Sequence, residues 1–204
     1  MGCADIPQQF KRKKNDSRDM LGEVRDSIEK SPVILKGDYP YIVTPLMDGI
    51  PAMDPKILRS VVDRMMRIGK FDCDLIVAPE AMGIPYAALI SAGKGIPFSI
   101  IRKRSYGLEG EIEVTETTGY STTSIFINGV RPGMRVAVVD DVVSTGGTLR
   151  GIVDGLRTAG ATVTEVVLAL NKSEDIFALE EELGIPIRYV AKIWLENGKP
   201  RCVC

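Results

Sequence analysis

Four short, predominantly apolar runs constrain the fold of this chain more than any other feature. They occupy residues 75–78, 98–101, 136–139 and 163–170. Helical patterns at 85–92, 148–159 and 173–183 alternate with these runs. Strands that are apolar on both faces and alternate with helices are typical of βαβ units around a buried parallel sheet. The pattern therefore predicts an α/β fold with an open, doubly wound parallel sheet and a core at residues 72–170.

The flanking segments are predicted to be accessory parts of a single domain of residues 1–204. Residues 1–17 are polar and carry the basic cluster Lys11–Lys14, which is typical of a mobile terminus. Residues 18–70 contain helical patterns at 18–30 and 54–68 and two short strand patterns around the Gly37-Asp38 turn. Together with residues 171–204, which carry a C-terminal strand, they are expected to form a small hood.

Composition excludes several classes of function. Lys and Arg total 26 against 27 Asp and Glu, so the chain lacks the basic excess of a protein that binds nucleic acid. The chain has no histidine, which excludes a histidine base, nucleophile or metal ligand. The four cysteines form no C-x-x-C pair, and no apolar run has the length of a signal peptide core or a membrane span. We expect a reduced, cytoplasmic protein with no nucleic acid or membrane partner.

The strongest motif is the run VAVVDDVVSTGGT at residues 136–148. An apolar strand ends in Asp140 and Asp141, and a turn then opens directly into a helix. The backbone N–H groups of such a turn and the helix dipole form an anion site, and glycines allow close approach. The carboxylates can accept hydrogen bonds from a sugar diol or hold a cation that the phosphate shares. The motif therefore predicts a sugar-phosphate site at Ser144, Thr145, Gly146, Gly147 and Thr148, with a divalent metal.

Two further loops lie at the same predicted edge of the sheet. Ala81, Met82 and Gly83 follow the first strand and precede a helix, so their backbone N–H groups face the ligand edge. Arg102 and Lys103 end the second strand and concentrate the positive charge that a polyanion requires. The three loops together predict a site for one polyanion.

These motifs resemble the phosphoribosyl-pyrophosphate signature of type I phosphoribosyltransferases, and the resemblance covers about residues 33–196. It implies that Asp140 and Asp141 contact the ribose hydroxyls and that residues 144–148 bind the 5′-phosphate. It also implies that residues 78–83 form the pyrophosphate loop, in which one peptide is often cis. Mg²⁺ is the implied cofactor, and the two aspartates would contact it indirectly, through phosphoribosyl pyrophosphate.

The segment from Arg102 to about Thr123 shows no helical or strand period, so we expect it to be a structureless, flexible lid. Tyr106, Gly107 and Gly110 in this segment are suited to a hinged flap. Transfer of the phosphoribosyl group passes through an oxocarbenium-like state, which must be shielded from water. Glu113 and Glu116 are the weak candidates for an acid or base in this segment.

Lys172, at the end of the fourth strand, bears on which purine is accepted. Hypoxanthine and guanine present an acceptor at position 6, which an ammonium satisfies, whereas adenine presents a donor there. The stretches at 47–51, 118–121 and 127–130 also resemble archaeal hypoxanthine/guanine phosphoribosyltransferases. Phe177 and Trp194 could stack on a purine, but we expect both to pack in the core.

The sequence thus favours a purine-salvage enzyme that uses hypoxanthine or guanine, phosphoribosyl pyrophosphate and Mg²⁺. An adenine or xanthine enzyme remains the nearest alternative. A regulator that keeps the fold and senses phosphoribosyl pyrophosphate is the alternative from another class. A homodimer is expected from the resemblance alone.

Overall fold

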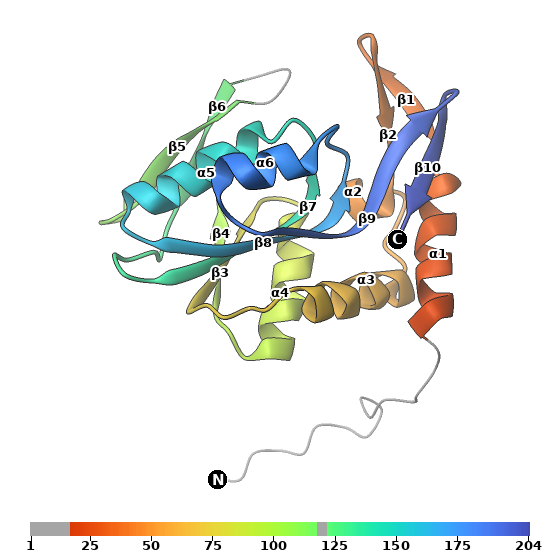
Figure 1. Cartoon of the computed structure of the whole chain (residues 1–204). Coiled ribbons are helices and arrows are strands. Elements are labelled where there is room, and N and C mark those ends of the chain that lie inside the picture. The colour runs from red at the N-terminus through yellow and green to blue at the C-terminus, as the bar shows by residue number, and fades with distance from the viewer. Residues whose placement is uncertain (1–16, 118–121) are drawn as a thin grey trace, which may run out of the picture.

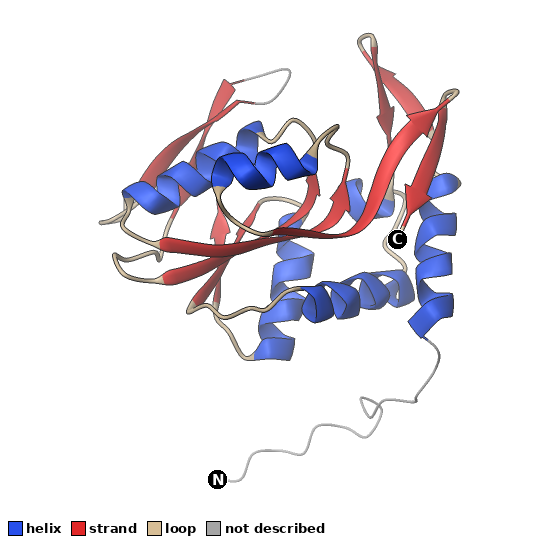
Figure 2. Cartoon of the chain, in the orientation of Figure 1, coloured by secondary structure: helices blue, strands red, loops and turns tan. Residues whose placement is uncertain are grey.

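Six strands form the central sheet of the computed structural model, which describes residues 17–117 and 122–204 (Figures 1 and 2). In the order in which they lie, the strands are β10 (Lys199–Val203), β9 (Ile187–Glu196), β8 (Thr162–Asn171), β7 (Arg135–Val143), β3 (Leu75–Pro79) and β4 (Phe98–Ile101). The strands from β9 to β4 are parallel, and β10 is antiparallel to β9. The predicted parallel sheet is confirmed.

Helices cover both faces of this sheet. The helices α3 (Pro55–Ile68) and α4 (Gly83–Lys94) lie on one face, and α5 (Gly147–Thr158) and α6 (Ile176–Leu183) lie on the other (Figure 1). Along β7, Ala137 and Val139 belong to the first core, whereas Val136 and Val138 belong to the second. Successive side chains of a strand point to opposite faces, so a strand buried on both sides is apolar throughout.

The segments before β3 join the core through their apolar faces. Val24 and Ile28 of α1 (Ser17–Glu29) are fully buried, and this helix lies beside β10 and α3 (Figure 1). The strands β1 (Val33–Lys36) and β2 (Tyr39–Ile42) form an antiparallel hairpin. Among the described residues, no helix is long and apolar enough to cross a membrane. The expected mobile terminus lies, apart from Ser17, outside the described residues.

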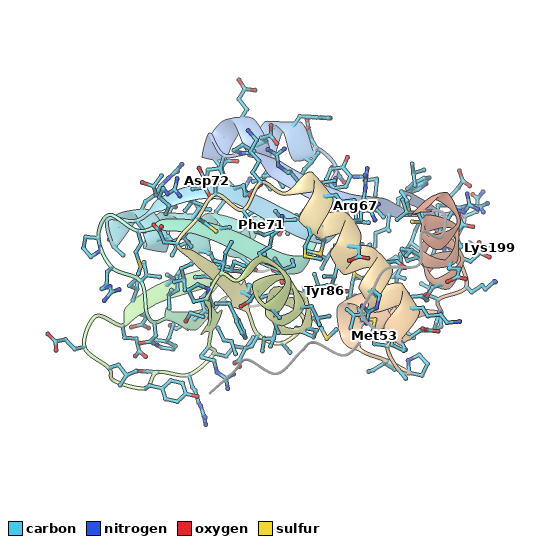
Figure 3. All side chains as sticks on the ribbon, turned by 90° about the horizontal axis from the view of Figure 1, so that it is seen from below. Met53, Arg67, Phe71, Asp72, Tyr86 and Lys199 are labelled. Atoms are coloured by element: carbon cyan, nitrogen blue, oxygen red, sulfur yellow. The ribbon has the colours of Figure 1, made fainter. Side chains whose placement is uncertain are left out.

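A short helix that the sequence did not predict, α2 (Pro45–Asp48), follows β2. Tyr86 of α4 is fully buried below the sheet and donates a hydrogen bond of 2.8 Å to the carbonyl of Leu46 (Figure 3). Burial and the charges of Asp141 and Asp140 raise the pKa of Tyr86, so its hydroxyl keeps the proton that it donates. This bond ties α2 to the core and sets Met47 and Asp48 beside the end of β7.

The expected lid at 102–123 is not structureless throughout, because residues 112–117 and 122–123 belong to strands. Strands β5 (Ile112–Thr117) and β6 (Thr122–Ile127) pair as an antiparallel hairpin, with residues 118–121 outside the described part. Val114, Ile125 and Ile127 are buried and belong to the same core as α5. Polar residues fill the alternate positions of β5, and this half-buried alternation was obscured by its glutamates and threonines.

The hairpin packs on α5 at a glycine, which makes its docking testable. A Cβ atom at Gly155 would overlap Val114 Cγ2, so Gly155→Ala should displace the hairpin. We expect the free energy of unfolding to fall by about 1–2 kcal/mol, because overpacking outweighs the roughly 1 kcal/mol gain in helix propensity. Chemical denaturation measures this change.

Gly22→Ala in α1 is the matched control, since its added Cβ would meet no described atom within 4 Å outside its own stretch of helix. This variant should be as stable as the wild type or up to about 1 kcal/mol more stable. A Gly155→Ala protein that gains as much stability as Gly22→Ala would contradict the close packing of β5 on α5.

Candidate active site

The loops that follow β3, β7 and β8 surround two adjoining cavities at the carboxyl edge of the sheet. One cavity measures about 410 Å³ and the other about 270 Å³. Met47, Asp140, Val142 and Thr148 line both. Ligands of open α/β sheets bind beyond the carboxyl ends of the strands, so this edge is the candidate site.

Most residues predicted for the site do lie together here. Ala81, Met82 and Asp141 line the larger cavity, Ser144, Thr145, Gly146, Gly147 and Lys172 line the smaller, and Asp140 and Thr148 line both. Arg102, Lys103, Tyr106 and Glu113 line neither cavity. Glu116 belongs to β5, but its side chain lies outside the described part of the chain.

The two adjacent aspartates have different environments. The Asp141 amide donates a hydrogen bond of 2.8 Å to Asp140 Oδ1. Burial, with a contribution from the Asp48 carboxylate, raises the pKa of Asp141 to about 6, although hydrogen bonds from Asp140 and the backbone act in the opposite direction. Asp141 is therefore a carboxylate whose charge is costly until a cation or a set of donors satisfies it.

This raised pKa predicts a pH dependence of stability. Because the folded pKa lies above the unfolded value of 3.8, Asp141 contributes stability at pH below about 4 that is lost as pH rises through 6. The Asp141→Asn variant has no carboxyl group to ionise at this position, so it does not lose this stability as pH rises. The free energy of unfolding of the variant, relative to wild type, should rise between pH 4 and pH 7 by up to about 3 kcal/mol.

Asp72→Asn is the control of opposite sign. The Arg135 guanidinium, through its hydrogen bonds, lowers the pKa of the exposed Asp72, so Asp72 contributes stability above its unfolded pKa that is lost in acid. The relative stability of this variant should fall as pH rises. Parallel pH profiles for the two variants would contradict the buried environment of Asp141.

The loop between β3 and α4 approaches the aspartates closely. A Cβ at Gly83 would lie 3.0 Å from Asp140 Oδ1 and 3.1 Å from the Val139 carbonyl oxygen, so a larger residue would displace the carboxylate. The Glu80-Ala81 peptide is cis, in the loop where the family resemblance anticipated such a bond. Gly83 thus lets this loop and the end of β7 share one cavity.

Glu80 connects this loop to the basic residues after β4. Its Oε1 accepts a bond of 2.7 Å from the Lys103 amide, and its Oε2 lies 3.1 Å from Arg102 Nη1. Arg102 Nε is buried and has no partner among the described residues. Glu80 was not among the predicted site residues, although it is the only acidic residue in the loop at 78–83.

The loop after β7 has the anticipated strand–turn–helix form. Gly146 has a φ of +80°, in the left-handed region, and α5 begins at Gly147. The Thr145 carbonyl accepts a bond of 2.8 Å from Arg150, and Arg150 makes two bonds of 2.7 Å to Glu182 of α6. The loop is therefore braced from behind, and the first turn of α5 lies at the wall of the smaller cavity.

The glycine at 146 has a second structural reason. A Cβ there would lie 2.9 Å from both Arg150 Nη1 and Leu179 Cδ2. The sequence suggested that this glycine leaves room for a ligand, but the close neighbours are groups of the protein itself. Gly146 therefore supports the turn and its packing against α6.

Lys172 lies against two tyrosines of the β1–β2 hairpin. Its Nζ is 4.6 Å from the centre of the Tyr39 ring and 5.6 Å from that of Tyr41. Both rings and Lys172 line the smaller cavity. Cation–π contact with two rings holds the ammonium at this wall of the cavity. The sequence analysis did not identify these tyrosines as site residues. Two aromatic residues at alternate positions, 39 and 41, are typical of any short strand and do not by themselves indicate a binding site.

Asp48 of α2 fixes one of these tyrosines. Tyr41 donates a hydrogen bond of 2.8 Å to Asp48 Oδ1, and the Thr44 amide donates one of 3.0 Å to Oδ2. Burial and the Asp48 bond raise the pKa of Tyr41, which keeps the phenol protonated. Asp48 also lines the larger cavity, so α2 links the two cavities.

The loop at 105–111 is ordered by Glu111, a residue that sequence analysis overlooked. The carboxylate of Glu111 accepts hydrogen bonds from Ser105 Oγ, from the amides of Tyr106 and Gly107, and from Asn128 Nδ2. These bonds, that of Asn128 first, lower the pKa of Glu111 to about 2. Tyr106 is half exposed, and its hydroxyl accepts bonds from Arg104.

Two aromatic residues behave differently from the expectation. Phe177 is 76% exposed and Trp194 is 37% exposed, so neither packs in the core. They do not line either cavity. Helix α6 buries Ile176, Leu179 and Leu183 instead, which turns Phe177 to solvent.

Asp48, Glu80, Asp140 and Asp141 bring carboxylates to the larger cavity, where a metal could use their oxygen atoms. No group of three or more Cys, Asp or Glu side chains able to hold a metal occurs in residues 17–117 and 122–204. Asp140 and Asp141 nevertheless offer hard oxygen atoms at one cavity wall. Mg²⁺ is commonly held by one or two carboxylates together with substrate phosphates and water, and the pair fits that mode.

Comparison with known proteins gives consistent matches. The sequence pattern described as "Phosphoribosyl transferase domain" matches residues 56–182. The hypoxanthine/guanine phosphoribosyltransferase of Methanohalobium evestigatum is 45% identical over 174 residues, which cover 85% of this chain and 91% of that protein. The enzyme of the same name from Methanocaldococcus infernus is 44% identical over 178 residues, covering 87% and 97%.

A solved structure matches the fold. The adenine phosphoribosyltransferase of Thermoanaerobacter pseudethanolicus superposes with a TM-score of 0.68 at 22% identity, covering 84% of this chain and 99% of that one. At this identity the likeness supports the arrangement of the elements alone.

Proposed function

The chain belongs to the phosphoribosyltransferase family, and from this membership we propose that it is a purine-salvage enzyme. It converts hypoxanthine or guanine and phosphoribosyl pyrophosphate to the nucleoside monophosphate and pyrophosphate. The observation that carries the proposal is the meeting of Asp140, Asp141, the 144–148 loop and Lys172 around adjoining cavities.

We place the 5′-phosphate of the substrate on the loop at residues 144–148. The first-turn amides of α5 and the helix dipole favour a dianion there, and the Arg150–Glu182 brace holds the loop in place. Asp140 and Asp141 then accept hydrogen bonds from the two ribose hydroxyls. The cost of burying the Asp141 charge is offset when these donors arrive.

The pyrophosphate group would lie in the larger cavity. Ala81, Met82 and Gly83 offer backbone N–H groups, and Arg102 and Lys103 supply positive charge from the neighbouring loop. Because Arg102 is paired with Glu80 in this structure, pyrophosphate would compete with Glu80 for the guanidinium.

The chemical step transfers the ribosyl carbon from pyrophosphate to a nitrogen of the base. Positive charge develops on the sugar in the oxocarbenium-like state, and the carboxylates of Asp140 and Asp141 stabilise it electrostatically. Tyr106 belongs to the loop that would close over the site and exclude water. Glu113 is exposed on β5, and with Glu116 it remains a weak candidate for proton transfer.

Mg²⁺ is the proposed cofactor, and Asp140 and Asp141 would contact it through the hydroxyls and phosphates of the substrate. When bound, it neutralises negative charge on the departing pyrophosphate. The chain's own residues supply the remaining positive charge, at Arg102 and Lys103.

The purine would lie in the smaller cavity, against the tyrosines of the hairpin. Lys172, held at the cavity wall by Tyr39 and Tyr41, would donate to the O6 atom of hypoxanthine or guanine. We also propose that residues 1–204 act as one domain, with residues 18–70 and 171–204 as the hood on the purine side. A cytoplasmic homodimer is the proposed working form.

The alternatives are less well supported. An adenine phosphoribosyltransferase matches this chain in fold, but at 22% identity the match does not indicate which base this chain accepts. A regulator would need a separate DNA-binding module, whereas Val24, Ile28, Val61 and Met65 of the N-terminal segment are buried in the common core. The relatives above 40% identity favour hypoxanthine and guanine.

The direct test is turnover of four purines, each supplied with phosphoribosyl pyrophosphate and Mg²⁺. Hypoxanthine and guanine should give nucleotide, with adenine and xanthine at least tenfold slower in kcat/KM. The Asp140→Asn and Asp141→Asn variants should each lose more than tenfold, since a charge-assisted hydrogen bond contributes roughly 1.5–3 kcal/mol.

Asp154→Asn is the control for these variants, because Asp154 is exposed on α5 and lines neither cavity. It should retain wild-type rates. Full activity in the double variant of Asp140 and Asp141 would overturn the placement of the sugar, and preference for adenine would overturn the choice of base.

Lys172 is tested separately. Lys172→Met keeps the apolar stem against the tyrosines but removes the ammonium, so KM for hypoxanthine and guanine should rise roughly ten- to a hundredfold. Lys172→Glu should raise the use of adenine relative to hypoxanthine, because a carboxylate repels O6 and accepts from the 6-amino group.

Lys36→Met serves as the control. Lys36 Nζ also lies over a tyrosine ring, 3.4 Å from the centre of Tyr41, but Lys36 is exposed and lines neither cavity. Its KM values should be unchanged. Equal effects of the two substitutions would mean that the hairpin's cation–π contacts, and not contact with the base, explain the result.

A further inference from the structure

A third cavity of about 510 Å³ lies between α1, α3 and β10. None of the described residues that line it also lines the cavities of the candidate active site. Figure 1 shows α1, α3 and β10 together at the end of the molecule that is far from the β5–β6 hairpin. The cavity is therefore a feature that purine salvage leaves unexplained.

The lining of this cavity is positively charged. Arg25 of α1 and Arg64 and Arg67 of α3 contribute three guanidinium groups to the lining, and Asp63 is the one acidic side chain among the described lining residues. Arg67 lies at the C-terminal end of α3 (Figure 3). Within the described part of the chain, the side chains of Arg64 and Arg67 make no hydrogen bond or ion pair. Their guanidinium groups can therefore bind carboxylates without breaking an existing contact.

Two thiols lie at the same cavity. Cys202 is buried on β10, and Cys204 is exposed just beyond the end of that strand. Residues two apart on a strand share a face, and their sulfur atoms are 3.7 Å apart. Two residues of strand span roughly 6.6 Å, within the range of Cα separations that a disulfide accepts.

The two thiols differ in ways that suit thiol–disulfide exchange. The Cys204 thiol is exposed, and its contacts are Cys202 and the Leu21 carbonyl, 3.6 Å away. The hydrogen bond between the two thiols, together with the charge of Arg25, lowers the pKa of Cys204. The same bond and burial raise the pKa of Cys202. An exposed thiol of lowered pKa beside a buried second thiol is the arrangement of an attacking and a resolving cysteine.

We propose that Cys202 and Cys204 are a thiol–disulfide exchange site, and that the arginine-lined cavity binds its oxidant, a small disulfide that carries carboxylates. This site stands apart from the proposed salvage reaction, because neither cysteine lines the active-site cavities.

The exchange balances in two steps. The Cys204 thiolate attacks one sulfur of the small disulfide, whose S–S bond breaks, and the departing thiolate takes a proton from water. The Cys202 thiol then loses its proton to solvent and attacks Cys204 Sγ, which releases the second thiol. The protein loses two electrons and two protons, and the small disulfide becomes two thiols.

The experiment compares two oxidants of opposite charge on the reduced full-length protein. Glutathione disulfide carries carboxylates, and cystamine carries ammonium groups. With either reagent, mass spectrometry of peptides should find a Cys202–Cys204 disulfide and the loss of two hydrogens. The ratio of the rate with glutathione disulfide to the rate with cystamine should fall about tenfold in the Arg64→Gln/Arg67→Gln variant.

Control variants separate the effect of the arginine charges from the reactions of the two cysteines. Arg59→Gln, on the exposed side of α3 and outside the cavity, should keep the wild-type ratio, and Cys73→Ser should still form the disulfide. Cys202→Ser should hold glutathione on Cys204 as a stable mixed disulfide, whereas Cys204→Ser should not react at this site. Each of these results supports the proposal.

Two results would overturn it. One is a wild-type protein that retains glutathione on a single cysteine and never forms the internal disulfide. The other is a ratio of rates that is the same in the Arg64→Gln/Arg67→Gln variant as in the wild type. Because the readouts are covalent state and exchange rate, they are independent of purine turnover.

Discussion

The burial of β7 on both faces is the constraint on which the rest of the structure depends. Its apolar residues alternate between two cores, and helices must cover both sides of the sheet. A strand placed there ends at an edge where several loops meet. Asp140 and Asp141 stand at that end, so a strand buried on both faces delivers two carboxylates to the cavities.

The site is held by contacts that lie behind it. Arg150 and Glu182 brace the loop at 144–148, Glu80 joins the loops after β3 and β4, and Tyr86 fixes α2. None of these contacts requires a ligand. The loops are therefore preorganised by the protein's own hydrogen bonds, and the binding of a polyanion need not pay the full entropy of ordering them.

Sequence reasoning succeeded where one residue pattern has one physical meaning. The apolar run at 136–139 could be buried only as a central strand, and its following aspartates and glycines predicted the anion loop that the structure places at the cavity. It failed at β5, because Val114 and Ile125 are separated by polar residues and a half-buried hairpin resembles a polar loop. It also missed Glu111, whose role depends on donors as distant as Asn128.

The sequence by itself determined the four apolar strands and the helices that alternate with them, the predicted phosphate loop at residues 140–148 and the family, because these depend on neighbours along the chain. The tertiary structure alone decided that Tyr39 and Tyr41 hold Lys172, that Gly83 admits the Asp140 carboxylate, and that Cys202 and Cys204 share a cavity with Arg64 and Arg67. These contacts join elements far apart in sequence, and they arise from packing that no local pattern encodes.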